Sequence, residues 1–209
     1  MLRPCTHRSS AKRSAILDAA QACFLEHGFA STSMDLVAAT AGVSKATIYA
    51  HFQSKDELFG AIIQRRCDDQ AEGLGALSVD ESLDARAALS EIGRKLLGLL
   101  LEPRVLGIYR MVVAETPRNP DLARIYFDAG PLRGKERLVA ILDALSQRGQ
   151  LSCPDPWQAV DQFIGMLRGE VFSRALLGLP PSDRTDAEKT VADAVEVMLR
   201  AYAPANASR

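Results

Sequence analysis

The sequence predicts an all-α protein with a small N-terminal domain of three helices and a larger C-terminal helical domain. Apolar residues recur along the chain at steps of three and four, and no stretch of useful length alternates apolar with polar residues as a strand does. Helix-capping residues and Gly or Pro breakers divide this pattern into segments of helical length. We expect the first domain to cover residues 10–70 and the second to cover residues 80–203.

Two short helices joined by a tight turn are predicted between Thr32 and Phe52. Thr32 and Ser33 can each cap the first helix, because a hydroxyl accepts from the free N–H groups of a first helical turn. With Thr32 as the cap, Asp35 would complete a capping-box pair. Four apolar side chains then follow at helical spacing and form one buried stripe: Met34, Val37, Ala38 and Ala41.

The turn and the second helix follow from Gly42 onward. Glycine adopts the left-handed conformation that ends many helices, and Ser44 can cap the next helix, which we expect over Lys45–His51. Ile48 and Phe52 lie four residues apart and are predicted to face inward. The other positions of this helix would then face outward: Lys45, Ala46, Thr47, Tyr49 and His51. Residues 33–52 are therefore predicted to form a helix-turn-helix.

The outward positions of this second helix have the chemistry of a surface that enters the major groove of DNA. Methyl groups of Thr and Ala can contact the thymine methyl, and polar tips can reach phosphates or base edges. Tyr49 could instead belong to the core, with only its hydroxyl at the surface. His51 is predicted to contact a phosphate or to end the helix rather than to bind a metal, because no second ligand is suitably spaced.

A third helix is predicted to start at Ser54, with Glu57 as its capping-box partner. Lys55 would lie in the first turn of this helix, where a cation opposes the helix dipole. We therefore interpret Lys55 as a residue with an external partner, such as a DNA phosphate.

The stretch resembles the DNA-binding domain of the TetR family of bacterial transcriptional repressors. The resemblance rests on the run T-x-x-x-L-V-A-x-x-A-G-V-S-K-A-T-I-Y-x-H-F-x-S-K-x-E-L-F and on the segment from Ile16 to Phe29. It covers about residues 10–70, with Ala46 where the family often has Gly and Asp35 as an acid near the DNA face. Together with the outward positions, it implies these DNA-binding residues: Thr32, Ser33, Ser44, Lys45, Ala46, Thr47, Tyr49, His51 and Lys55.

The composition is that of a soluble protein with its positive charge at one end. The chain has 209 residues, of which 47% are hydrophobic, and it contains no apolar run near the length of a membrane span. The formal net charge is −1. Residues 1–66 contain eight Lys or Arg against five Asp or Glu, whereas the remainder contains 17 against 21. Such an asymmetry is expected when one end of a protein binds nucleic acid.

The first 13 residues are basic and contain no acid. This segment could follow a DNA groove or backbone, or it could be a solvated tail. Lys12 and Arg13 are the better candidates for phosphate contacts, because they lie close to the first helix. No apolar secretion signal is present, so we expect a cytoplasmic protein without membrane association.

No catalytic or metal-binding pattern stands out. The four cysteines form no C-x-x-C pair: Cys5, Cys23, Cys67 and Cys153. We expect reduced thiols, with Cys23 on the buried stripe of the first helix, while Cys67 or Cys153 could sense redox state. The three histidines fall in the first quarter of the chain, and there is no carboxylate pair or Glu-x-x-His motif. We therefore predict no enzyme activity, no metal and no cofactor.

The second domain is predicted to be helical throughout, after a connection at residues 71–82. Helices are expected at residues 83–101, at residues 104–115, from Pro120 onward with Asn119 as cap, at residues 155–177 and at residues 185–202. The pair Gly130-Pro131 should kink or restart the third of these, because proline lacks the N–H that a helix needs. Asp155 is expected to cap the fourth.

This second domain is similar to the C-terminal domain of the AefR-like branch of the TetR family in two stretches, VVAETPRNPDLARIYFDAGP and FIGMLRGEVFSRALLGL. The resemblance implies a ligand-binding and dimerisation domain. Independently of it, the last two helices carry apolar stripes that could pair in a two-fold four-helix bundle. The dimer-interface residues predicted in this way are Val171, Val191, Val195, Met198 and Tyr202, and internal core is the alternative for each.

An effector pocket is expected among the middle helices, since pockets for small molecules are mostly apolar. The predicted lining residues are Tyr109, Met111, Tyr126, Phe127, Phe163 and Met166, again with plain core as the alternative. The sequence as a whole predicts a ligand-responsive repressor that binds a palindromic operator in double-stranded DNA as a homodimer and is released by a small apolar molecule. The alternatives are a helical ligand-binding or interaction module, or a helical enzyme, with a vestigial DNA-binding domain.

Overall fold

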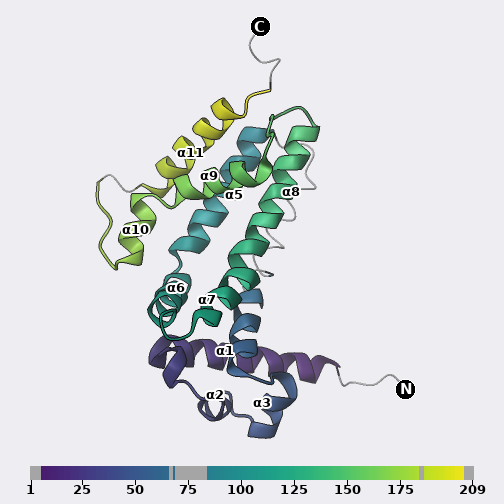
Figure 1. The fold of residues 1–209 in the computed structure, drawn as a ribbon, viewed down its shortest axis with the longest axis vertical. Coiled ribbons are helices and arrows are strands. Elements are labelled where there is room, and N and C mark those ends of the chain that lie inside the picture. The colour runs from purple at the N-terminus through teal and green to yellow at the C-terminus, as the bar shows by residue number, and fades with distance from the viewer. Residues whose placement is uncertain (1–5, 66–67, 69–83, 184–185, 205–209) are drawn as a thin grey trace. The chain divides into compact units, whose positions relative to one another are not determined.

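The computed structural model describes residues 6–65, 68, 84–183 and 186–204. Helices joined by turns account for these residues, and the described part of the chain contains no strand (Figure 1). The predicted all-α fold class is confirmed. Among the described residues, no helix has both the length and the apolar character needed to cross a membrane. The predicted connection at residues 71–82 lies outside the described residues, as do Cys5 and Cys67.

The helices follow one another closely in the chain. The N-terminal ones are α1 (Thr6–Ser31), α2 (Met34–Thr40) and α3 (Lys45–His51), followed by helical residues 55–65. The later elements are α5 (Ala85–Leu101), α6 (Pro103–Glu115), α7 (Pro120–Phe127), the π-helical turn η1 (Asp128–Leu132), α8 (Arg133–Gln147), α9 (Pro156–Leu167), α10 (Glu170–Leu176) and α11 (Ala187–Ala201).

The chain divides into two compact units. Unit 1 consists of residues 1–68 and 107–131, and unit 2 consists of residues 69–106 and 132–209. Unit 1 therefore contains α7 and most of α6 in addition to the first three helices. Each unit has a hydrophobic core of its own.

The core of unit 1 is built around three aromatic rings. Phe24 and Phe29 of α1 pack against each other with ring centroids 5.3 Å apart. Phe59, from the helix at residues 55–65, meets both rings edge-on at 5.9 and 5.7 Å. Edge-to-face aromatic pairs add to the free energy gained by burying the rings. Ile48 and Phe52 join the same core, so the short helix α3 is anchored from within the unit.

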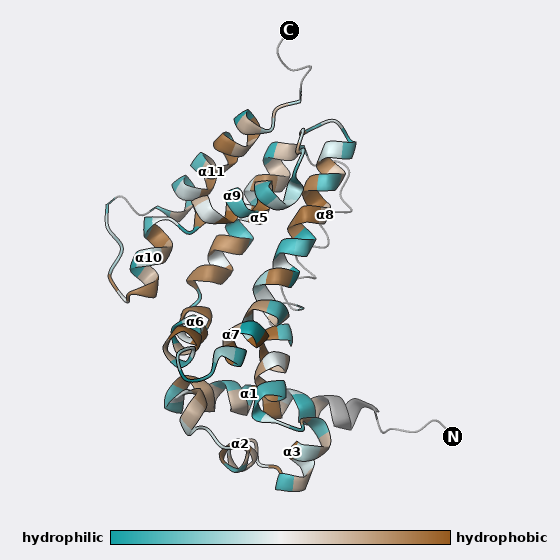
Figure 2. Ribbon diagram, in the orientation of Figure 1, coloured by the Kyte–Doolittle hydropathy of each residue, from teal (hydrophilic) through white to brown (hydrophobic). Residues whose placement is uncertain are grey.

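Unit 2 has its core among α5, α8, α9 and α11, where α5 packs against α11 and α8 against α9. Hydrophobic stretches alternate with hydrophilic ones along these helices, as expected for helices buried on one face (Figure 2). At the crossing of α5 and α11, a Cβ added to Gly93 would lie only 2.7 Å from Cγ1 of Val191. Glycine thus lets the two helices approach closely.

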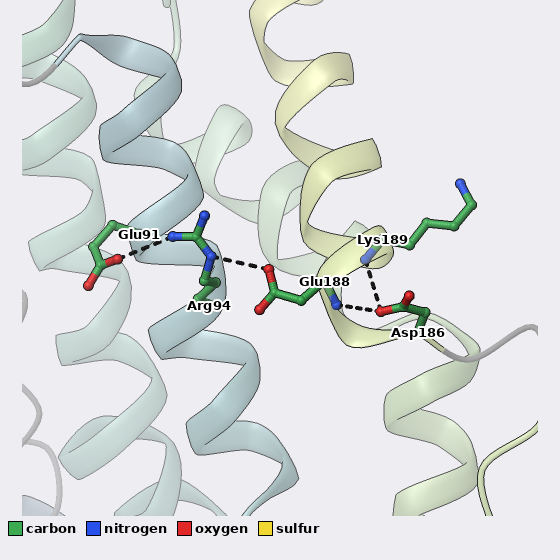
Figure 3. Close-up of polar contacts among 5 residues, drawn as sticks. All are labelled: Glu91, Arg94, Asp186, Glu188 and Lys189. Carbon is green, nitrogen blue, oxygen red and sulfur yellow. Dashed lines mark hydrogen bonds and ion pairs between the residues drawn. The ribbon is translucent and has the colours of Figure 1, made fainter.

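Polar contacts flank this crossing. The Arg94 guanidinium donates to Glu188 of α11 at 3.2 Å and lies 3.3 Å from Glu91 on its own helix (Figure 3). Asp186 caps α11 by accepting from the backbone N–H groups of Glu188 and Lys189. Exposed ion pairs of this kind contribute little to the free energy of folding, so the apolar contacts dominate.

Several predicted boundaries are correct. Asp155 caps α9 by accepting from the Gln158 N–H at 3.1 Å, and Gly42 has the expected positive φ of 64°. The single predicted helix at residues 155–177 is wrong, because α9 ends at Leu167 and α10 starts at Glu170. Gly169, with ψ −149°, leaves the helical conformation at that point. Glycine is a weak helix former, which makes such a break inexpensive.

The Gly130-Pro131 pair changes the helix in a different way. Instead of kinking or restarting it, the chain widens into the π-helical turn η1 and continues directly as α8. A π-helical turn bonds residues five apart, so it can accommodate the missing N–H of Pro131. Asn119 does precede α7, with Pro120 in its first turn, but its side chain makes no capping hydrogen bond.

Candidate nucleic-acid interface

The start of α2 is capped by Ser33 and not by Thr32. The Ser33 hydroxyl accepts from the backbone N–H of Leu36 at 3.1 Å. Thr32 is 1% exposed, and its hydroxyl lies 2.8 Å from the carbonyl oxygen of Gly28 and 3.1 Å from that of Cys23. Its side chain therefore ties α2 to the end of α1. This burial removes the Thr32 side chain from the predicted set of DNA contacts.

The turn between α2 and α3 is built as the sequence predicts. Gly42 adopts the left-handed conformation, and the N–H of Val43 donates to the carbonyl oxygen of Ala38 at 3.0 Å. Ser44 then caps α3 by accepting from the Thr47 N–H at 3.1 Å, and the two hydroxyls lie 2.8 Å apart. The turn and cap together set the direction in which α3 leaves the corner.

Helix α3 has one buried side and one open side. Ile48 is 0% exposed and Phe52 is 2% exposed, so both face inward as predicted. Tyr49 is 45% exposed, which excludes the alternative that its ring belongs to the core. The predicted outward side chains are all accessible: Lys45, Ala46 and Tyr49 are exposed, and Thr47 and His51 are partly exposed.

Lys45, at the first position of α3, forms an ion pair with Asp35 of α2. The ammonium lies 2.8 Å from a carboxylate oxygen of Asp35, and both side chains are more than half exposed. The hydrogen bond to Asp35 and its negative charge raise the pKa of Lys45. The sequence places an acid near this surface but does not show that it pairs with Lys45, which lies ten residues away.

Lys55 is not the outward-facing cation that the sequence predicts. Its ammonium donates to the carbonyl oxygens of Phe29 at 2.6 Å, Thr32 at 3.0 Å and Ala30 at 3.2 Å. It also lies 4.4 Å from the centroid of the Phe29 ring. Burial lowers the pKa of Lys55, against the opposing effect of the charges on Asp56 and Glu115. The ammonium thus has three acceptors within the protein, where the sequence predicts an external partner.

Arg13 of α1 lies beside the end of α3. Its guanidinium carbon is 5.2 Å from the ring centroid of Phe52, the residue that directly follows α3. Arg13 and Lys12 are both exposed. The two cations that the sequence selects from the basic N-terminal segment are thus accessible to a polyanion, and Arg13 is held against the helix-turn-helix.

The predicted effector-pocket residues do not all belong to one unit. Tyr109, Met111, Tyr126 and Phe127 fall in unit 1, whereas Phe163 and Met166 fall in unit 2. The rings of Tyr109 and Tyr126 meet edge-on at 6.2 Å. Phe163 is 3% exposed and packs in the unit 2 core. One open depression of unit 2 lies along α9 and contains none of the predicted residues; its lining is Asp155, Trp157, Gln158, Asp161 and Gln162.

The predicted dimer interface is largely interior. Val191, Val195 and Met198 are at most 3% exposed and form part of the unit 2 core, so they are not available to a second copy. Val171 and Tyr202 are partly buried against the same core, and the Tyr202 hydroxyl donates to Gln162 at 2.6 Å. The apolar stripe of α11 is real, but it covers α5 and α9 of its own chain.

Within the described residues, no three His, Cys, Asp or Glu side chains are placed to hold a metal ion. Cys23 is 3% exposed in the unit 1 core. Burial raises the pKa of Cys153, which lowers the fraction of reactive thiolate.

Comparison with known proteins covers both parts of the chain. Residues 16–62 match the family described as bacterial regulatory proteins of the tetR family, and residues 87–204 match the AefR-like transcriptional repressor C-terminal domain. The transcriptional activator FasR of Mycolicibacterium smegmatis is 41% identical over 63 residues, which cover 30% of this chain and 29% of that protein. The matches span about a third to a half of the first curated relatives' own length.

Solved structures match nearly the whole chain. A TetR-family regulator from Mesorhizobium loti shares 28% identity and a TM-score of 0.79, covering 93% of this chain and 98% of its own. The flavonoid-responsive regulator FrrA shares 33% identity and a TM-score of 0.76, covering 94% and 99%. A SmeT–triclosan complex shares 26% identity and a TM-score of 0.66, covering 92% and 91%. These relatives are transcriptional regulators, not enzymes, and the chain belongs to the TetR family, with a C-terminal domain of the AefR-like type.

Proposed function

We propose that the chain is a dimeric repressor that reads a palindromic operator through α3 and releases it on binding a small apolar molecule. The observation that carries this proposal is the open side of α3, held by a buried Ile48 on its other side. We assign DNA binding to residues 10–70 and effector binding and dimerisation to residues 80–203. The proposed DNA contacts are Ser33, Ser44, Lys45, Ala46, Thr47, Tyr49 and His51, with Arg13 as a proposed phosphate contact beside them.

The modest charge of the DNA-binding part makes pairing of two subunits important. A dimer places two recognition helices about 34–36 Å apart, in successive major grooves of one DNA face. We propose that the outward sides of α9 and α11 pair across the two-fold axis, since Trp157 is 45% exposed and Val197 is 50% exposed. These residues replace the buried stripe of α11 in the proposed interface.

The proposed effector is a small molecule with a large apolar surface. One relative is named a flavonoid-responsive regulator, and another was solved in complex with triclosan. An effector can lower DNA affinity only to the extent that it binds the released state better than the DNA-bound state. The aromatic side chains of α6 and α7 in unit 1, including the Tyr109–Tyr126 pair, remain candidates for such contacts.

Selection of bound fragments from a random DNA library tests the DNA-binding part of the proposal. We expect the purified protein to enrich a near-palindrome and to bind it with an association constant that falls as salt rises, since each neutralised phosphate releases counterions. Sequencing of the retained fragments shows whether a near-palindrome is enriched. Fluorescence anisotropy of the selected duplex across a salt series measures the association constant. Failure to enrich any sequence, or salt-independent binding, would contradict the proposal.

Two variants test whether the exposed side of α3 contributes to DNA affinity. Tyr49→Ala removes an exposed ring from α3 and should weaken binding to the selected duplex while the circular dichroism spectrum stays unchanged. Leu177→Ala truncates a residue that is 73% exposed in unit 2 and should bind as the unaltered protein does. A reporter gene placed behind the selected sequence then distinguishes repression from activation.

A further inference from the structure

The last turn of α1 ends without a helical continuation. Gly28, with φ 79° and ψ 165°, kinks α1 near its end, and Ser33, in an extended conformation, directly precedes α2. The final carbonyl groups of a helix have no N–H partner in the same helix and need donors from elsewhere. The carbonyls of Phe29 and Ala30 are in this position, and the carbonyl of Thr32 follows directly after the helix.

The Lys55 ammonium supplies those donors from the start of the next long helix. It carries three N–H groups, and the three carbonyl oxygens lie within 2.6 to 3.2 Å of its nitrogen. A cation is also favourable at the negative end of the α1 dipole. A cation in the first turn of its own helix opposes the dipole of that helix. For Lys55 this unfavourable interaction is offset by the carbonyl groups at the end of α1.

The same connection is held from the other side by Thr32. Its buried hydroxyl reaches back to the carbonyl oxygens of Cys23 and Gly28 in α1. Residues 29–32, which form the end of α1 and its connection to α2, are thus tied to the preceding part of α1 by Thr32 and to the helix at residues 55–65 by Lys55. The Phe29 ring beneath the ammonium packs against Phe59, one turn along from Lys55.

We infer that Lys55 is a positioning residue of the DNA-binding motif, which holds the α1–α2 connection in place and does not contact a phosphate. Ser33 follows this connection directly, and α2 packs against α3. The direction in which α3 presents its side chains therefore depends on where residues 29–32 are held. The inference rests on the proposed function, because it assigns Lys55 a role in reading the operator.

Lys55→Met keeps an unbranched stem of similar length and removes all three N–H donors. We expect it to weaken binding to the selected duplex about tenfold or more at every salt concentration, while the plot of log affinity against log salt stays parallel to that of the unaltered protein. Arg13→Met serves as the matched control for a lost phosphate contact and should flatten the slope by about one unit. A Lys55→Met slope that flattens like that of Arg13→Met would overturn the inference.

Hydrogen exchange without DNA tests the same inference independently. The amides of Leu36 and Val37 donate to the Ser33 hydroxyl and carbonyl, so they report whether the start of α2 is held. Lys55→Met should speed their exchange, while that of core amides such as Ile62 stays close to its original rate. Equal acceleration throughout unit 1, or none, would overturn the positioning role.

Two further comparisons distinguish a failure of the inference about Lys55 from a failure of the proposed function. If Lys55→Met does not fold, Lys55→Gln, which retains two N–H donors, gives the same comparison of slope and exchange. If the unaltered protein binds no DNA, the proposed function fails, and the exchange of the Leu36 and Val37 amides still shows whether Lys55 holds the connection. A Lys55 variant with unaltered exchange and unaltered affinity would overturn the inference about Lys55 and would not affect the proposed function.

Discussion

Lys45 and Lys55 stand ten positions apart, each in the first turn of a helix, yet their ammonium groups have different surroundings. Lys45 is exposed and pairs with one carboxylate, that of Asp35. Lys55 is partly buried among three carbonyl groups. The partner of an exposed ion pair is easily exchanged for another anion, whereas a partly buried cation with three acceptors exchanges them less easily. Of these two lysines, Lys45 is therefore the more accessible to a DNA phosphate.

Asp35 is expected to restrain Lys45 in the absence of DNA. Asp35→Asn removes the partner charge and one negative charge from the DNA-facing surface. We expect the variant to bind unrelated duplexes several-fold more tightly and to show a salt slope steeper by about one unit, as for one added phosphate contact. Anisotropy titrations with an unselected duplex measure this.

The matched control is Asp193→Asn in α11, where another exposed lysine–aspartate pair, Lys189–Asp193, has an N–O distance of 2.6 Å. It makes the same change in net charge away from α3 and should leave the slope unchanged. In a Lys45→Met background, Asp35→Asn should lose most of its effect. If the effect persists there, Asp35 acts on DNA directly and not through Lys45.

Local features of single residues were predictable because their causes lie within a few positions in the chain. The left-handed Gly42, the Ser44 cap and the inward Ile48 all follow from near neighbours. The acceptors of Lys55 lie 23 to 26 residues away, so no local pattern indicates them. The burial of Thr32 has the same origin, since it depends on how α1 ends.

At the scale of elements, the crossing of α5 and α11 is a close contact of unit 2 that a substitution can probe. Gly93→Ala would place a methyl group 2.7 Å from Cγ1 of Val191 and 3.4 Å from the Phe163 ring. Overpacking a filled core typically costs about 1–3 kcal/mol. We expect a loss of this size in the free energy of unfolding, measured by chemical denaturation.

Gly98→Ala on the same helix provides the control. Gly98 is exposed, and a Cβ there would have no neighbour within 4 Å. Replacing an unconstrained helical glycine by alanine should stabilise the protein by roughly 0.5–1 kcal/mol. Adding Val191→Ala to Gly93→Ala should recover part of the loss, because it vacates the space that the new methyl needs. Strictly additive effects of the two changes would argue against a direct clash.

An apolar stripe can pack within its own chain or against a second chain. The helices that pack beside it decide between the two. The periodicity of α11 correctly predicts a stripe at Val191, Val195 and Met198, but these residues contact α5 and α9 instead of a second chain. The break between α9 and α10 likewise depends on a single glycine within an otherwise continuous apolar pattern. Sequence periodicity identifies the apolar stripe of a helix, but it does not show which helix packs against that stripe.

For the whole molecule, dimerisation is the property on which the proposed operator recognition depends. We expect sedimentation equilibrium to give a dimer at micromolar concentration without DNA. Val197→Asp places a charge on the exposed side of α11 and should shift the equilibrium toward monomer, since burying an unpaired carboxylate is costly. Affinity for a full palindrome should fall in parallel.

Val113→Asp is the matched control, because Val113 is 57% exposed on α6 in unit 1, outside the proposed interface. It should remain dimeric at the same concentration. A dimer unaffected by Val197→Asp, with or without an effect of Val113→Asp, would place the interface elsewhere.

The shortness of α2 and α3 has a consequence for how DNA binding responds to stability. Each helix has seven residues, and isolated helices shorter than about 12–15 residues are marginal in water. The recognition surface therefore exists only while the unit 1 core is assembled. A core substitution such as Ile16→Ala, far in sequence from any proposed base contact, would reduce the fraction of molecules able to bind. Occupancy of the proposed operator would then depend on the folding equilibrium of unit 1 as well as on the concentration of the proposed effector.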